Sequence, residues 1–176
     1  MEKSEHKKIQ NTKAALLAAI TKLYKTTPVS EITVSALCKE ASVNRTTFYK
    51  YYSVPMDVLE EKLSEIFGDT RLTLSENNSL PLDQYMYQVL LASAQMCYDN
   101  RKFLGMCHEC NISFEKYLAD FFAFSDASDN ASLYKNIFIS GGIGAIFAAW
   151  GKTGFKESPE SVAGTITELT LKLNSQ

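Results

Sequence analysis

Hydrophobic residues recur along most of the chain at the spacings of a helix with one buried face, three, four, seven or eight residues apart. The first such stretch runs from about Glu5 to Lys25, and the last begins at Pro159, after Ser158 as a cap. Only four prolines and eight glycines interrupt a chain of 176 residues. The pattern therefore predicts an all-α protein of about nine helices.

Two short helices are predicted after Pro28, which ends the first helix because the residue before a proline avoids the α region. Thr33 is suited to cap a helix that ends near Ala41, and Asn44 is suited to cap a second one that reaches about Tyr52. The apolar residues available to hold the two at a steep angle are Leu37, Ala41, Val43, Phe48 and Tyr52. Two short helices wedged in this way are typical of a helix-turn-helix.

The second short helix would present a polar and cationic face. Phe48 and Tyr52 are four residues apart and share one side of the helix, which we expect to face inward. The other side then carries Thr46, Tyr49 and Lys50. A helix of about two turns does not form alone in water, so this chemistry favours presentation to a partner such as the DNA major groove.

The stretch ITVSALCKEASVNRTTFYKYY, residues 32–52, resembles the DNA-binding signature of tetracycline-repressor-like (TetR) regulators. The Ile-Thr-Val start, the turn at Ala41-Ser42-Val43 and the aromatic run after Thr47 stand at matching spacing behind a long first helix. Two departures are Ser42, where glycine is usual, and Pro55, where a lysine is often found. If the turn needs a positive φ, Ser42 carries some strain.

The resemblance implies a domain organisation. Residues 1–53 would form a three-helix DNA-binding domain, and residues 54–176 a ligand-binding and dimerisation domain of about six helices. The stretch GGIGAIFAAWGKTGFKESPESVA, residues 141–163, resembles the last two helices of one branch of the family, through which these proteins dimerise. Glycine inside a helix costs about 1 kcal/mol relative to alanine, and close approach of a second copy would explain the small residues Gly141, Gly142, Ala145, Ala148 and Ala149.

The resemblance also implies which residues contact DNA. Five would lie in or beside the major groove, namely Arg45, Thr46, Thr47, Tyr49 and Lys50. Thr33, Tyr51 and Ser53 would bind phosphates, and Ser35 and Asn44 complete the predicted set. The chemistry fits, because arginine pairs with guanine and threonine methyl groups contact thymine. Simple packing of Tyr49 and Tyr51 is the alternative.

Charge is distributed unevenly within an overall net charge of −2. Residues 1–55 hold nine Lys and Arg against four Glu, whereas residues 56–176 hold nine against sixteen Asp and Glu. A basic head on an acidic body favours a head-first approach to a polyanion. Charge runs are also common on any helical surface, so the uneven charge is only weak support for binding to a nucleic acid.

The run Cys107-His108-Glu109-Cys110 has the spacing of one helical turn but lacks the four ligands of a zinc site, since the other histidine is His6. We interpret its cysteines as small apolar residues and predict no metal and no cofactor. All four cysteines of the chain fit reduced thiols in a cytoplasmic protein. A redox or metal role for this run is the alternative.

Several other classes of protein are not predicted. The N-terminus lacks the apolar region of a signal peptide, and the run Ile137–Trp150 is too short to span a bilayer. Gly141-Gly142-Ile143-Gly144 lacks the spacing of a nucleotide-binding loop. With two histidines and no recognisable triad or carboxylate pair, the sequence does not predict an enzyme.

Together these patterns predict a cytoplasmic, sequence-specific transcriptional regulator. We expect a homodimeric repressor that binds a pseudo-palindromic operator in double-stranded DNA. A small apolar effector would bind among the aromatic residues of the C-terminal domain and modulate the repressor. The alternative is a co-activator or adaptor of the same fold that acts through a protein partner with little or no DNA binding of its own.

Overall fold

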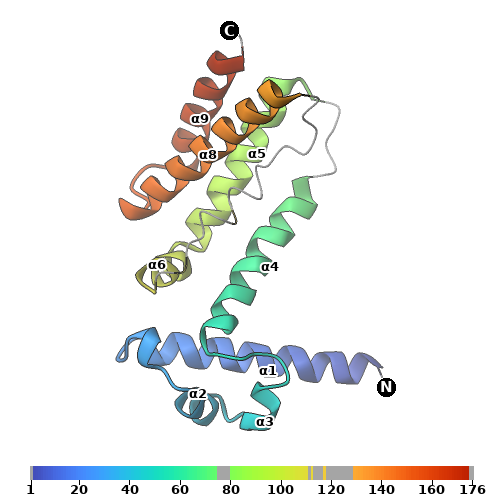
Figure 1. Cartoon of the computed structure of the whole chain (residues 1–176), viewed down its shortest axis with the longest axis vertical. Coiled ribbons are helices and arrows are strands. Elements are labelled where there is room, and N and C mark those ends of the chain that lie inside the picture. Colours follow the sequence, from blue (N-terminus) through green and yellow to red (C-terminus); the bar gives the residue numbers. More distant parts are fainter. Residues whose placement is uncertain (1, 75–79, 111, 113–116, 118–128, 175–176) are drawn as a thin grey trace. The chain divides into compact units, whose positions relative to one another are not determined.

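The computed structural model describes residues 2–74, 80–110, 112, 117 and 129–174, which form helices and no strand (Figure 1). The all-α class that the sequence predicts is confirmed. The chain divides into two compact units, residues 1–63 and 64–176, so α4 (Met56–Leu74) begins in the first unit and ends in the second. The hydrophobic spacing also predicts a helix over residues 112–124, most of which lie outside the described residues.

The N-terminal unit is built on one long helix. Its further elements, besides the start of α4, are α1 (Glu2–Leu23), the 3-10 helix η1 (Val29–Glu31), α2 (Val34–Ala41) and α3 (Arg45–Phe48). Leu16 and Ile20 on α1, Leu37 on α2 and Phe48 on α3 have no exposed surface. These side chains form one apolar core, which holds the four-residue helix α3 in place.

Local chemistry fixes the turn between α2 and α3. The Thr33 hydroxyl accepts a hydrogen bond from Ala36 N at 3.1 Å, and Asn44 Oδ1 accepts one from Thr46 N at 2.9 Å. Both caps were predicted, and both are confirmed. Between the helices Ser42 has φ 55° and ψ 36°, the left-handed conformation that ends α2. The strain expected if serine replaced glycine here is therefore present.

The helix that begins at Arg45 is shorter than predicted. It ends at Phe48, and the chain continues in tighter turns, with Tyr51 N donating to Phe48 O at 2.9 Å. The chain then turns into α4, where the Asp57 carboxylate accepts hydrogen bonds from Ser53 N at 2.6 Å and Val54 N at 3.0 Å. A carboxylate in the first turn of α4 thus satisfies backbone donors that precede the helix.

The C-terminal unit contains α5 (Leu82–Asp99), α6 (Arg101–Glu109), α8 (Asn130–Lys152) and α9 (Pro159–Asn174), together with the end of α4. Helices α5 and α9 pack against each other over much of their length, and α8 contacts both α6 and α9 (Figure 1). The predicted cap at Ser158 is confirmed, since its Oγ accepts a hydrogen bond from Ser161 N at 3.3 Å. Asp129 caps α8 in the same way at 2.7 Å from Ser132 N.

Trp150 organises the end of α8. Its ring centre lies 4.9 Å from that of Phe155, 6.1 Å from Phe147 and 6.3 Å from Tyr98. Phe155 has φ 56° and directly follows Gly154 at φ 78°, so the chain reverses in the left-handed region. Burial of the Phe155 ring, which is 8% exposed, offsets the strain of a bulky residue in this conformation.

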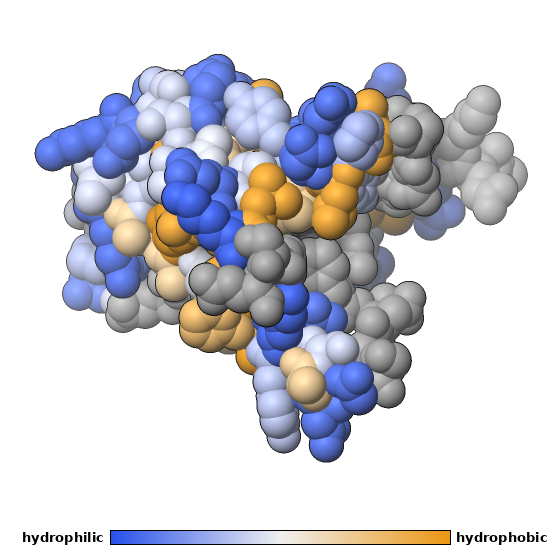
Figure 2. Space-filling view, turned by 90° about the horizontal axis from the view of Figure 1, so that it is seen from above, coloured by the Kyte–Doolittle hydropathy of each residue, from blue (hydrophilic) through white to orange (hydrophobic). Residues whose placement is uncertain are grey.

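One face of α8 is apolar but exposed. Tyr134, Ile137 and Phe138 are 66%, 59% and 68% exposed, and Leu169 on α9 is 47% exposed. Further along the same helix the exposed residues become small, at Gly141, Gly142, Ala145 and Ala149, while Ala148 is buried within the chain. Figure 2 shows apolar residues reaching the surface between polar ones on the side of the molecule that it presents.

Replacing Ser42 by glycine should stabilise the N-terminal unit, because glycine adopts the left-handed conformation without a Cβ clash. We expect Ser42→Gly to raise the free energy of unfolding by about 0.5 to 1 kcal/mol, measured by denaturant titration. Ser42→Ala is the matched control, since it keeps the Cβ and should bring no gain. A loss of stability in the glycine variant would contradict the assigned strain.

Candidate nucleic-acid interface

The predicted DNA-binding residues lie at the start of α2, on α3 and in the turn that follows it. Thr47 is half-exposed and the other nine are exposed. These nine are Thr33, Ser35, Asn44, Arg45, Thr46, Tyr49, Lys50, Tyr51 and Ser53. The fold therefore brings the whole predicted set to one stretch of the N-terminal unit, with its polar groups available to a ligand.

Burial of two aromatic rings turns this face outward. Phe48 is fully buried and Tyr52 is 7% exposed, with their ring centres 5.7 Å apart. Tyr49 and Tyr51 lie between them along the chain and are 53% and 36% exposed. Packing within the unit therefore explains the aromatic side chains of Phe48 and Tyr52. It does not explain that of Tyr49, which is more than half exposed.

Two of the polar residues serve the fold and keep donors free for a ligand. The Thr33 and Asn44 oxygens accept the capping hydrogen bonds of α2 and α3. A threonine hydroxyl can still donate its hydrogen, and an asparagine amide retains its two N–H donors. Both residues can therefore donate to an oxygen ligand without loss of either cap.

The exposed charges around α3 are mainly positive. Arg45 is the first residue of α3, Lys50 lies in the turn after it, and Lys39 lies exposed on α2. The acidic neighbour Glu40 is paired with Lys22 of α1, with 2.5 Å between Lys22 Nζ and Glu40 Oε1. Cations grouped with hydroxyl and amide donors suit a phosphate backbone and the acceptor-rich edges of bases.

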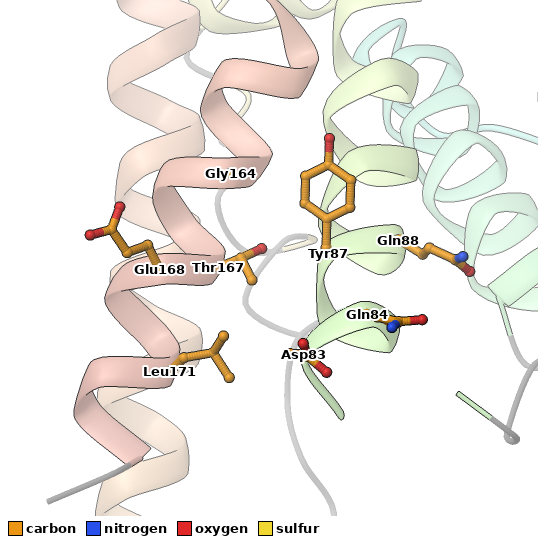
Figure 3. A pocket seen from close by; sticks show the side chains of 8 residues that line it. All are labelled: Asp83, Gln84, Tyr87, Gln88, Gly164, Thr167, Glu168 and Leu171. Carbon is orange, nitrogen blue, oxygen red and sulfur yellow. The ribbon is translucent and has the colours of Figure 1, made fainter. Parts of the chain in front are cut away.

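A groove in the C-terminal unit lies between α5 and α9 and has a volume of about 510 Å³. Figure 3 shows Thr167 and Leu171 directed from α9 toward α5, with the Tyr87 ring in the space between the helices. The remaining lining residues are Asp83, Gln84, Gln88, Gly164 and Glu168. Of the aromatic residues expected to line an effector site, Phe114, Phe121, Phe122 and Phe124 lie outside the described residues.

The cysteines of α5 and α6 are held as thiols by their surroundings. Burial raises the pKa of Cys97 to about 12, and burial together with the neighbouring Cys110 raises the pKa of Cys107 to about 12. Burial also raises the pKa of Cys110 above its ordinary value. A thiolate is the nucleophile and the metal ligand, so none of these residues is activated for either role.

The described residues contain neither a metal-binding cluster nor a membrane-spanning helix. No group of three or more His, Cys, Asp or Glu side chains there could hold a metal ion. No helix in the same part of the chain has the length and hydropathy needed to cross a membrane.

No family model and no curated protein matches the sequence. Several solved structures share the fold. The dihydroxyacetone kinase operon activator DhaS is 20% identical, with a TM-score of 0.63, over 92% of this chain and 95% of its own. The fatty acid degradation regulator FadR from Bacillus halodurans is 13% identical, with a TM-score of 0.59, over 91% and 94% of the two chains.

A TetR transcriptional regulator from Streptococcus agalactiae 2603V is 17% identical, with a TM-score of 0.59, over 97% of this chain and 99% of its own. Because these likenesses extend over both units, the chain has the TetR-type fold along nearly its whole length. The resemblance that the sequence carries at residues 32–52 is thus confirmed at the level of fold.

The raised pKa values make Cys97 and Cys107 slow to react. We expect both to resist alkylation by iodoacetamide in the native protein at pH 8, where almost all of each thiol is protonated. Unfolding should expose them, so alkylation in denaturant, followed by peptide mass spectrometry, is the control. Because only the unfolded thiols ionise near pH 9, the stability of the fold should fall between about pH 9 and 12. Rapid native labelling of Cys107 would contradict this assignment.

Proposed function

We propose that this protein is a sequence-specific DNA-binding transcriptional regulator that acts as a homodimeric repressor. The observation that carries the proposal is the surface around α3. There, burial of Phe48 and Tyr52 leaves Arg45 and Thr46 exposed on a helix too short to be stable alone, and Lys50 exposed in the turn that follows it. A hydrophobic core that holds the four-residue helix α3 at the surface is suited to placing that helix in the major groove of DNA.

Base recognition would come from α3 itself. Arg45 is the first residue of the helix and can donate two hydrogen bonds to the O6 and N7 acceptors of guanine. The Thr46 and Thr47 side chains each offer a methyl group for thymine and a hydroxyl for a base edge. These three neighbours would specify the sequence of a half-site.

Phosphate contacts would position α3 in the groove. Thr33 and Ser53 lie at the two ends of the helix-turn-helix, and the exposed residue Tyr51 lies near the second end. Hydroxyl groups of this kind, with Lys50, suit phosphate oxygens on both sides of the groove. Affinity should therefore fall steeply with salt, because each neutralised phosphate releases counterions.

The exposed face of α8 supports a homodimer. Its bulky residues, Tyr134, Ile137 and Phe138, precede its small residues, which begin at Gly141 and continue to Ala149. Two copies of α8 that crossed antiparallel near Gly141 would place Phe138 of each against Ala145 of the other. A two-fold interface needs such self-complementarity, and burial of these rings would remove an apolar face that is unusual on a monomer.

A dimer would set two copies of α3 about 34 Å apart, the distance between successive major grooves on one side of DNA. The operator would then be a pseudo-palindrome. A small effector would act by binding one arrangement of the dimer more tightly than the other. The groove between α5 and α9 is the candidate site, and the Tyr87 ring and Leu171 in it suit an apolar molecule with polar substituents.

A second candidate is a co-activator or adaptor that acts through a protein partner. The name of DhaS describes an operon activator, which favours activation over repression. An adaptor would need the apolar face of α8 or another surface for its partner and would show little affinity for DNA alone. Retention of a defined operator by the purified protein would separate the repressor from the adaptor.

Arg45→Ala should weaken operator binding by about 1 to 3 kcal/mol and relax the preference at one base pair. The physical reason is the loss of a bidentate contact to guanine, which reads the base as well as attracting the polyanion. Fluorescence anisotropy with operator duplexes that vary one position at a time would measure both effects. Lys25→Ala, which removes an exposed cation at the end of the first helix, is the control. Equal affinity and unchanged preference in Arg45→Ala would refute the assignment.

Phe138→Glu should convert the dimer to a monomer, because it introduces a charge into an apolar interface that has no partner for it. The separated heads should bind the operator at least about 100-fold more weakly, since the second half-site no longer adds to the first. Sedimentation equilibrium measures the first effect and anisotropy the second. Leu82→Glu, which places the same charge at an exposed leucine of α5, should leave the dimer intact. A dimeric Phe138→Glu variant would exclude this face as the interface.

A further inference from the structure

A single carboxylate joins three elements of the N-terminal unit. Glu61 on α4 accepts a hydrogen bond from the Lys13 ammonium of α1 at Oε1 and one from the Tyr52 hydroxyl at Oε2. Tyr52 belongs to the turn that follows α3. Because Glu61 is 32% exposed and Lys13 is 25% exposed, the cluster is partly shielded from water. Both oxygens of one side chain are thus occupied by residues distant from it in the sequence.

The cluster alters the pKa of its central residue. Partial burial raises the pKa of Glu61, but the hydrogen bonds from Lys13 and Tyr52 and the positive charge of Lys13 outweigh burial. The net effect is a pKa below the ordinary value of a glutamate. Glu61 is therefore fully ionised at neutral pH and accepts both hydrogen bonds as a carboxylate, the stronger form of the interaction.

Packing does not require the Tyr52 hydroxyl. The ring is 7% exposed and lies against Phe48, a position that phenylalanine would fill equally well. The hydroxyl instead reaches Glu61. It therefore links α4 to the end of residues 45–52, the recognition segment, which comprises α3 and the turn that follows it. A buried hydroxyl without such a partner would be destabilising.

Lys13 extends the cluster to the other tyrosine. Its Nζ atom lies 5.9 Å from the centre of the Tyr51 ring, within the range of a cation–π contact. Tyr51 is 36% exposed and is one of the residues to which the proposed function gives a phosphate contact. Glu61 holds Lys13, and Lys13 in turn lies over Tyr51. One carboxylate on α4 therefore orients the two tyrosines that end the recognition segment.

We propose that Glu61 is a positioning residue for DNA binding, which fixes Tyr51 and Tyr52 relative to α4 through Lys13 and the Tyr52 hydroxyl. The inference rests on the proposed function and deepens it. Glu61 is acidic and would repel phosphate, so direct attraction to DNA is no reason for its presence near this surface. Removing the charge of Glu61 should therefore weaken DNA binding. If Glu61 acted only through electrostatic repulsion of the phosphates, removing its charge would strengthen DNA binding instead.

The test compares Glu61→Gln with Tyr52→Phe and the double variant. The glutamine keeps the size of the side chain, and the phenylalanine removes only the hydroxyl. With a duplex selected by the wild-type protein, we expect each single variant to bind about tenfold more weakly. The loss of affinity in the double variant should be much smaller than the product of the two single losses. The reason is that both substitutions act on the same hydrogen bond, between Tyr52 and Glu61. Glu60→Gln, on the exposed side of α4, is the charge-matched control and should bind at least as tightly as the wild type.

A second readout follows the position of the segment itself. Amide hydrogen exchange over residues 49–53 should accelerate in Glu61→Gln and not in Glu60→Gln, while exchange within α2 stays unchanged in both. Wild-type affinity or wild-type exchange in Glu61→Gln would overturn the positioning role and leave the proposed function intact. Failure of the wild-type protein to select any duplex would overturn the proposed function, and this inference with it.

Discussion

Burial of the Phe48 ring is the interaction on which the rest of the N-terminal unit depends. The helix that carries it has four residues and could not persist in water without tertiary contacts. A fully buried phenylalanine contributes about 1.5 to 3 kcal/mol relative to an exposed one. That single anchor, assisted by Tyr52, holds the polar face in place before any ligand arrives. A surface ordered in advance avoids part of the entropic cost of binding.

The two units present opposite kinds of surface. The N-terminal unit exposes cations, hydroxyls and amides around α3, whereas the C-terminal unit exposes tyrosine, isoleucine and phenylalanine side chains along α8. The first kind suits a polyanion and the second suits an apolar partner such as a second copy of the chain. A protein with both properties can attach two identical readers to one duplex, and this combination is the basis of the proposed mechanism.

Much of this could be predicted from the sequence, because the signals are local. The caps at Thr33, Asn44 and Ser158 follow from single residues, and the inward turn of Phe48 and Tyr52 follows from helical periodicity. The end of α3 could not be predicted from local periodicity, because the chain turns there into the next helix, whose Asp57 carboxylate accepts hydrogen bonds from Ser53 N and Val54 N. Ala148 belongs to the same stretch of small residues as its neighbours, and only packing within the chain shows that it is buried.

The Glu61 cluster shows a further limit of sequence analysis. Lys13, Tyr52 and Glu61 are separated by up to 48 positions, and none of them has a pattern that indicates the others. The groove between α5 and α9 is of the same kind, since its lining comes from helices about 80 residues apart. Local residue chemistry predicts elements and faces, whereas such polar links depend on which helices meet.

The proposed regulator depends on a surface around α3 that reads a DNA sequence. Selection of bound fragments from genomic DNA by the purified full-length protein, followed by sequencing, tests it most directly. We expect enrichment of one pseudo-palindromic motif whose half-sites lie about one helical turn apart. Recovery of fragments with no motif above the input would contradict it.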